Sequence, residues 1–129
     1  MKGTQAVLTT TLMFLNATLA TMAIETAVLV AGLSHRHVLS VRVFAGIWLS
    51  ACTLPVVWLV LPWFFSAPGS DGAYVVTAES FAVVTECCLF WFAFVRSQPR
   101  DMWATARDAM AILVANMLSY TAGGYILAT

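Results

Sequence analysis

The sequence has few charged residues and no excess of either sign. Six of its 129 residues are basic and six are acidic, so charged residues make up 9% of the chain, whereas roughly 25% is usual in soluble domains. So little charge cannot cover a water-facing surface, and a net charge of zero gives no electrostatic footprint for nucleic acid. The composition excludes an ordinary soluble domain and predicts no nucleic-acid partner.

Familiar signatures of catalysis and cross-linking are also missing. The chain contains no phosphate loop, no Gly-x-Ser-x-Gly, no His-Glu-x-x-His and no Cys-x-x-Cys. Cys52, Cys87 and Cys88 all fall in apolar segments, and a disulfide between adjacent cysteines is geometrically awkward. These thiols could bind a soft metal, although buried cysteines usually pack as small hydrophobic side chains. The sequence therefore weakens the case for an enzyme and names no cofactor.

Long apolar runs dominate what remains. Hydrophobic residues make up 61% of the chain, and its mean hydropathy is +0.89. A helix needs about 20 mostly apolar residues to cross a bilayer, and four stretches provide them: 7–33, 43–65, 73–95 and 104–127. Short connections make successive helices antiparallel neighbours. We predict an all-α integral membrane protein, a single transmembrane domain over 1–129 with four transmembrane helices in an up-down bundle.

The basic residues are distributed unevenly between the two predicted membrane faces. Lys2 lies at one face, and the other five lie at the opposite face: Arg36, Arg42, Arg96, Arg100 and Arg107. The positive-inside rule then places the first and third connections in the cytoplasm. We expect both termini outside, and the bacterial cytoplasmic (inner) membrane as the location.

Three acidic residues, Glu25, Glu79 and Glu86, lie within predicted spans. An ionised side chain at the centre of a membrane helix costs roughly 2.5–3.5 kcal/mol, and either protonation or a partner inside the bundle avoids that cost. Such residues are candidates for function by default.

Counting residues from the cytoplasmic end of each span estimates their depth. Glu25, Glu86 and Cys52 share one level, and Asn116 lies slightly further out. Glu79 belongs to an outer level that Asn16 and Ser119 are expected to share. The spacing predicts a polar interior with carboxylates at two depths.

These residues define the candidate site, with Glu25, Glu86, Glu79 and Asn116 as ion- or proton-binding groups. The sequence favours proton-coupled or cation transport or binding, with protons or small cations as ligands and the lipid bilayer as surroundings. A bundle this small is expected to act as a homo-oligomer or beside other membrane subunits. One alternative is a structural or assembly subunit, in which the same side chains only join helices. Another is a membrane-embedded enzyme acting on a lipid- or quinone-like substrate.

Prolines interrupt the second predicted span. Pro55 and Pro62 should free the carbonyls of Ala51 and Trp58, which could line a polar cavity.

Two smaller features complete the candidates. His35 and His37 are expected in a solvated interfacial turn, and Gly123 with Gly124 is expected to allow close helix approach.

The length, the four spans and Glu25 in the first span resemble the plan of the small multidrug resistance transporters. In that family a membrane-embedded glutamate exchanges protons for a cationic drug. Glu79 and Glu86 have no counterpart there, so the chain is not assigned to that family.

Overall fold

A computed structural model of the chain describes the backbone of residues 2–128 and the side chains of residues 5, 8, 9 and 11–123. The described chain is all-helical, as the sequence predicts. Its elements are α1 (Lys2–Gly32), α2 (Leu39–Pro55), the π-helical turn η1 (Val56–Val60), α3 (Leu61–Phe64), α4 (Asp71–Phe90), the π-helical turn η2 (Trp91–Val95) and α5 (Met102–Ala128). Connections 33–38, 65–70 and 96–101 are short and contain no regular element.

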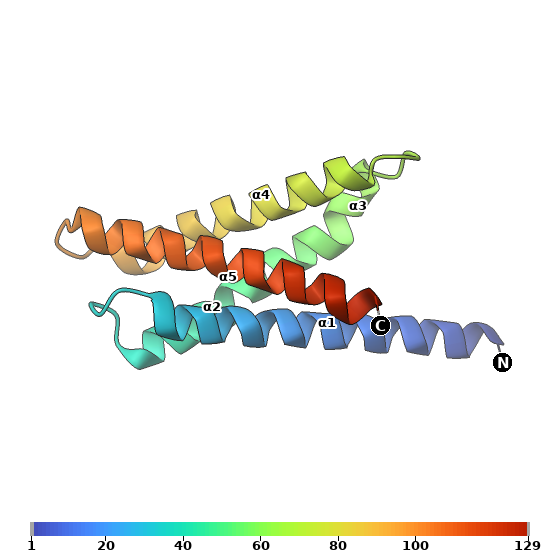
Figure 1. Cartoon of the computed structure of the whole chain (residues 1–129), viewed down its shortest axis with the longest axis horizontal. Coiled ribbons are helices and arrows are strands. Elements are labelled where there is room, and N and C mark those ends of the chain that lie inside the picture. Colours follow the sequence, from blue (N-terminus) through green and yellow to red (C-terminus); the bar gives the residue numbers. More distant parts are fainter. Residues whose placement is uncertain (1, 129) are drawn as a thin grey trace.

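Four antiparallel rods run up and down the long axis of the molecule (Figure 1). One rod is α1, the second consists of α2, η1 and α3, the third of α4 and η2, and the fourth is α5. The first rod packs against α2 and α5, and α4 packs against α5 and α2. Connections 33–38 and 96–101 lie together at one end, which we call the closed end. At the opposite end, which we call the open end, α1 and α4 diverge (Figure 1).

The second rod bends where its prolines lie. The α-helical pattern stops at Pro55, continues through η1 and resumes as α3, with Pro62 in its first turn. In η1 the Leu61 N–H donates to the carbonyl of Val56, five residues back. Proline lacks an N–H and cannot continue a regular ladder, so the helix accommodates the two prolines by widening between them.

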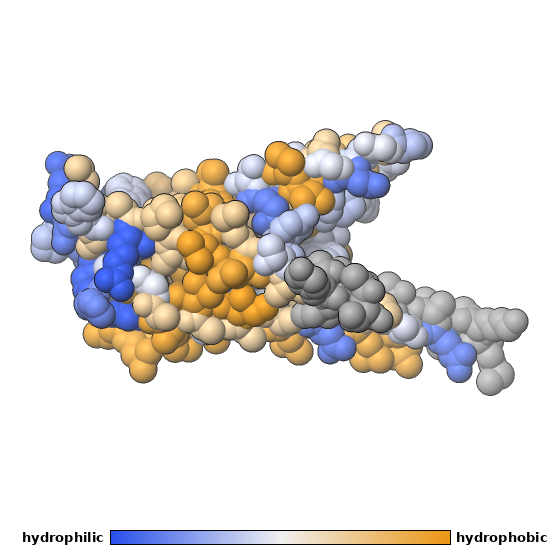
Figure 2. Space-filling view, viewed as in Figure 1, coloured by the Kyte–Doolittle hydropathy of each residue, from blue (hydrophilic) through white to orange (hydrophobic). Residues whose placement is uncertain are grey.

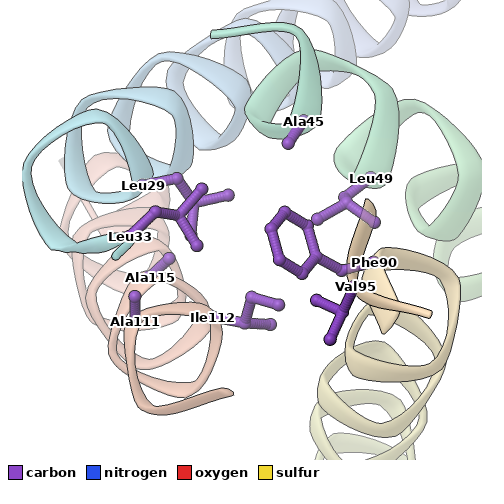
Figure 3. Packing of buried hydrophobic residues seen from close by; sticks show 9 residues of the cluster. All are labelled: Leu29, Leu33, Ala45, Leu49, Phe90, Val95, Ala111, Ile112 and Ala115. Carbon is purple, nitrogen blue, oxygen red and sulfur yellow. The ribbon is translucent and has the colours of Figure 1, made fainter. Parts of the chain in front are cut away.

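The hydrophobic core occupies the closed half of the bundle. Its members are Leu29, Leu33, Ala45, Leu49, Phe90, Val95, Ala111, Ile112 and Ala115. In Figure 3 the Phe90 ring lies among side chains from all four rods. Only 2% of Phe90 is exposed. A packed apolar layer of this kind excludes water between the closed end and the middle of the bundle.

Small residues let the first rod approach its neighbours closely. A Cβ atom on Gly46 would lie 2.5 Å from the Cα of Thr26, and one on Gly32 would lie 2.9 Å from the Cβ of Ala111. Gly123 was expected to serve the same purpose, and that prediction is wrong: a Cβ there would meet nothing within 4 Å. The side chain at position 124 lies outside the described residues.

The surface is apolar where a soluble protein would be polar. Many large apolar side chains are exposed along all four rods, and Figure 2 shows them as a belt beside the hydrophilic closed end. Three helices are long and apolar enough to cross a membrane: Thr11–Gly32, Leu39–Phe64 and Asp71–Val95. The described part of α5 does not reach the same mean hydropathy, since it carries Arg107, Asp108 and Asn116.

Candidate functional site

Glu25 of α1 lies in the interior, with 4% of the residue exposed. Its Oε1 accepts a hydrogen bond of 2.8 Å from Ser119 Oγ of α5, and its Oε2 accepts one from Ser50 Oγ of α2. Ser50 lies one turn from Gly46 on the same face of α2, so the close approach of α1 and α2 at Gly46 carries Ser50 to Glu25. Three helices therefore meet at this carboxyl group.

Glu86 of α4 is more deeply buried, with 1% exposed. Thr53 Oγ1 of α2 lies 2.8 Å from its Oε1, and Asn116 Nδ2 of α5 donates to its Oε2 at 2.8 Å. Asn116 Nδ2 also donates to the carbonyl of Ile112 at 3.0 Å, which holds the amide in place. The Glu86 carboxyl group thus joins α4 to both neighbouring helices.

The two carboxyl groups use a common set of helix faces. Ser50 and Thr53 are three residues apart on α2, and Asn116 and Ser119 are three residues apart on α5. Residues at this spacing project from the same side of a helix. One face of α2 and one face of α5 therefore serve both Glu25 and Glu86, which lie on opposite rods.

Each hydroxyl in this network also lies within hydrogen-bond distance of a backbone carbonyl of its own helix. The oxygen-to-oxygen distances are 2.8 Å from Ser50 to Gly46, 3.1 Å from Thr53 to Leu49 and 3.0 Å from Ser119 to Asn116. A hydroxyl has one proton and two lone pairs. It can donate to an ionised carboxylate, or it can donate to the carbonyl and accept the proton of a neutral carboxyl group. These contacts are therefore satisfied in either protonation state of the glutamate.

A cavity of about 230 Å³ lies beside this network, toward the end of the bundle that carries the termini. All four rods line it, and Glu25, Thr53, Asn116 and Ser119 lie at its inner limit. The cavity could hold several water molecules, since one occupies about 30 Å³ in the liquid.

Glu79 is a further acidic group of the cavity wall. It is half-buried and lies seven residues before Glu86 on α4, two turns nearer the open end. The structure thus places acidic groups at two levels, one at the inner limit of the cavity and one along its wall.

One freed backbone carbonyl faces the same cavity, although not one that the sequence predicted. Tyr74 Oη donates to the carbonyl of Val57 at 2.9 Å, and both residues line the cavity. With π-helical spacing, the partner of Val57 would be the N–H of residue 62, which proline lacks. The sequence predicts freed carbonyls at Ala51 and Trp58 from α-helical spacing, and those two stay predictions.

One expected depth relationship differs from the structure. Ser119 was assigned to the level of Glu79, yet it binds Glu25. Side chains on a helix lean toward its N-terminus, so Glu25 reaches outward past the level of its own Cα. Cys52 was expected at the level of Glu86; its side chain is exposed, because it precedes Thr53, the partner of Glu86, by about 100° around α2.

The three cysteines do not form a metal site. Cys52 and Cys88 are exposed, and Cys87 is half-buried. No group of three or more His, Cys, Asp or Glu side chains in the described part of the chain could hold a metal ion. Cys87 and Cys88 are adjacent on α4, so their thiols point in different directions around the helix.

The closed end holds a second polar cluster, which sequence reasoning missed. Asp108 of α5 is 1% exposed, and its Oδ1 accepts a hydrogen bond of 2.7 Å from the Ser34 backbone N–H. Its Oδ2 accepts one of 3.1 Å from Arg36 Nε and lies 3.0 Å from His37 Nε2. Connection 33–38 is thereby tied to α5.

His37 was expected in a solvated turn, and that prediction is wrong, since only 3% of the residue is exposed. His35 is exposed as expected. A signal for the buried cluster was present: Asp108 lies near the start of the fourth predicted span, close to the basic first connection. An acidic residue there needs a partner, and Arg36 was available to provide it.

Comparisons with known proteins add no family to this description. No protein-family model, no curated protein and no solved structure matches the chain.

Proposed function

We propose that the chain is a four-span protein of the bacterial cytoplasmic membrane that carries protons, or a small cation coupled to them, through Glu25 and Glu86. Glu79 serves as an acidic group on the path from the outer surface. Asn116 positions Glu86. The protein acts as a homo-oligomer or beside other membrane subunits, with protons or small cations as its ligands.

The observation that carries this proposal is the pair of buried carboxyl groups with hydroxyl partners that suit both protonation states. Ser50 and Ser119 surround Glu25, and Thr53 contacts Glu86. Two like charges in a buried site strongly oppose each other, so loss of a proton from one carboxyl group favours retention by the other. Such a pair can take up and release one proton without leaving a buried polar atom unpaired.

Protons fit this site better than metal ions do. A calcium ion takes six to eight oxygen ligands, and magnesium requires a near-octahedral set. Each carboxyl oxygen of Glu25 and Glu86 already has a side-chain hydrogen-bond partner. A small cation would instead occupy the cavity, beside Glu79.

The directions in which the polar residues of α5 point support α5 as the fourth span. Asn116 is turned inward to Glu86, and Arg107 Nε donates to the carbonyl of Gly32 at 2.9 Å, at the end of the bundle. Lipid-facing positions of α5 are apolar, with Met110, Met117 and Leu118 exposed. The lower hydropathy of α5 thus reflects its interior face.

The orientation rests on the charges and aromatic residues at the two ends. The closed end carries the arginine cluster, which favours the cytoplasm. Trp103 is 88% exposed at this end, and Trp63 is 83% exposed at the other, as expected for aromatic belts at the two interfaces. Both termini then lie outside, and the cavity opens outward.

The test is proton movement into vesicles that contain the purified protein and an internal pH dye. We expect Glu86→Gln and Glu25→Gln each to reduce the flux by about a hundredfold or more. At Glu86 the glutamine oxygen accepts from Asn116 and its NH₂ donates to Thr53, so the fold is retained. Asp71→Asn, which removes an exposed carboxylate at the start of α4, is the matched control and should retain the flux.

Two results would refute the proposal. One is an absence of proton flux in the unmodified protein under pH, Na⁺ and K⁺ gradients. The other is a flux in the two glutamine variants equal to that of Asp71→Asn, which would favour an assembly subunit whose carboxyl groups only join helices. An enzyme acting on a quinone-sized substrate is less well supported, because ligand pockets usually exceed roughly 300 Å³ and the cavity is about 230 Å³.

A further inference from the structure

From the open end, the cavity reaches Glu25 directly and reaches Thr53 and Asn116, the two partners of Glu86. Below these residues lies the hydrophobic core, which includes Leu49, Phe90 and Ile112. A proton that arrives at Glu86 therefore needs a further group, and a passage through the core, to reach the closed end. This requirement rests on the function proposed above.

Phe90 lies directly on that route. It follows Glu86 by one helical turn on α4, toward the closed end, so the two side chains share a face. The Phe90 ring also contacts the ring of His37 edge-on, with 5.1 Å between ring centroids and 75° between planes. Phe90 thus separates the innermost carboxyl group of the bundle from a buried imidazole.

The surroundings of His37 suit a group that gains and loses a proton. Charged groups near it are Arg36 of the same connection, Arg42 of α2 and Asp108 of α5. Arg42 Nε donates to the His37 carbonyl at 2.9 Å and does not use the ring. The ring nitrogen Nε2 lies 3.2 Å from Arg36 Nε and 3.0 Å from Asp108 Oδ2.

These two contacts correspond to the two charge states of the ring. In the neutral tautomer whose Nε2 carries no proton, Nε2 accepts from the Arg36 Nε–H, which it shares with Asp108 Oδ2. In the imidazolium, Nε2 donates to Asp108, whose carboxylate balances the new charge.

We propose that His37 is the inner proton acceptor of the pathway and that the Phe90 ring is the barrier between it and Glu86. When the ring moves aside and admits water, the O–H bond of Glu86 breaks and an N–H bond forms at His37 Nε2. Glu86 becomes a carboxylate, and His37 becomes a cation paired with Asp108. Loss of the same proton to cytoplasmic water at connection 33–38 restores neutral His37.

The test uses the same vesicles, with His37→Gln as the main variant and His35→Gln as its matched control on the same connection. Glutamine can still donate a hydrogen bond to Asp108 but cannot carry a proton at physiological pH. We expect His37→Gln to lower the flux by at least about tenfold, with unchanged helix content and unchanged carboxyl infrared bands of Glu25 and Glu86. The His35→Gln flux should equal that of the unmodified protein, because His35 is exposed.

A second variant tests the barrier independently. Phe90→Ala should raise the flux several-fold, and Phe90→Ala with Glu86→Gln should return it to the level of Glu86→Gln alone. Wild-type flux in both His37→Gln and Phe90→Ala would overturn this inference. If Glu86→Gln is inactive in the same experiment, the proposed function survives that result; if Glu86→Gln retains full flux, the proposed function itself fails.

Discussion

The position of the polar network depends on the contact between α1 and α2 at Gly46, and a Gly46→Ala variant would disturb it directly. The added Cβ would lie 2.5 Å from the Cα and 2.9 Å from the Cβ of Thr26. Backbone atoms cannot rotate away, so the two helices must separate. Glu25 precedes Thr26, and Ser50 follows Gly46 by one turn, so the separation should also lengthen the contact between Glu25 and Ser50.

The expected cost combines two opposing effects. Overpacking of a well-packed interior costs about 1–3 kcal/mol, and a backbone clash belongs at the upper end of that range. Replacing glycine by alanine inside a helix returns about 1 kcal/mol. The net loss at Gly46 should be about 2 kcal/mol. At Gly32 the clash is with the Cβ of Ala111, so about 1 kcal/mol of strain and the gain in helix propensity nearly cancel.

Reversible unfolding in mixed micelles, followed by tryptophan fluorescence and circular dichroism, measures this series. Gly123→Ala is the control, because its Cβ would meet nothing within 4 Å, and it should be neutral or stabilised by up to about 1 kcal/mol. We expect stability to increase in the order Gly46→Ala, Gly32→Ala, Gly123→Ala. Equal stability of the Gly46 and Gly123 variants would refute the argument that helix contact at Gly46 holds the network together.

Two further variants test other contacts of the bundle. Tyr74→Phe removes a hydrogen bond to a backbone carbonyl freed by proline and should cost about 1 kcal/mol in the same unfolding assay, whereas Tyr120→Phe should cost less than half of that. Asp108→Asn leaves the Arg36 guanidinium without its ion-pair partner and should cost about 3 kcal/mol of unfolding free energy. Its control, Asp101→Asn, retains a side-chain oxygen that accepts from the exposed Ala104 N–H and should be neutral. A loss of equal size at both aspartates would contradict the role given to Asp108.

The helices could be predicted from sequence because apolar composition leaves the backbone few alternatives. In lipid, peptide groups must bond within their own segment, so long apolar stretches indicate helices regardless of side-chain detail. The rotation of each helix about its own axis could not be predicted in this way. A Cβ on Gly46 would clash with α1 and a Cβ on Gly123 would meet nothing within 4 Å, yet both are glycines in apolar segments. Contact partners depend on where the rods diverge, and hydropathy carries no such information.

The glutamates of the candidate site could be identified from sequence, but their hydroxyl partners could not. A glutamate in an apolar segment is conspicuous, and Glu25, Glu79 and Glu86 all face the interior or its cavity. Their hydroxyl partners were not conspicuous, since serine and threonine are ordinary in membrane helices. Ser50 and Thr53 acquire their role only because α2 turns that face toward Glu25 and Glu86.

The two oxygens of Glu86 have different partners, and this difference bears on function. Asn116 Nδ2 can only donate, so Oε2 must accept in every state of the site. Thr53 can donate or accept, so a proton on Glu86 belongs on Oε1. A carboxyl group that merely joined helices would gain from donors at both oxygens, because fixed donors hold it more firmly. One fixed oxygen and one exchangeable oxygen give a group that stays in place while its proton comes and goes, which is what a proton carrier in the membrane interior requires.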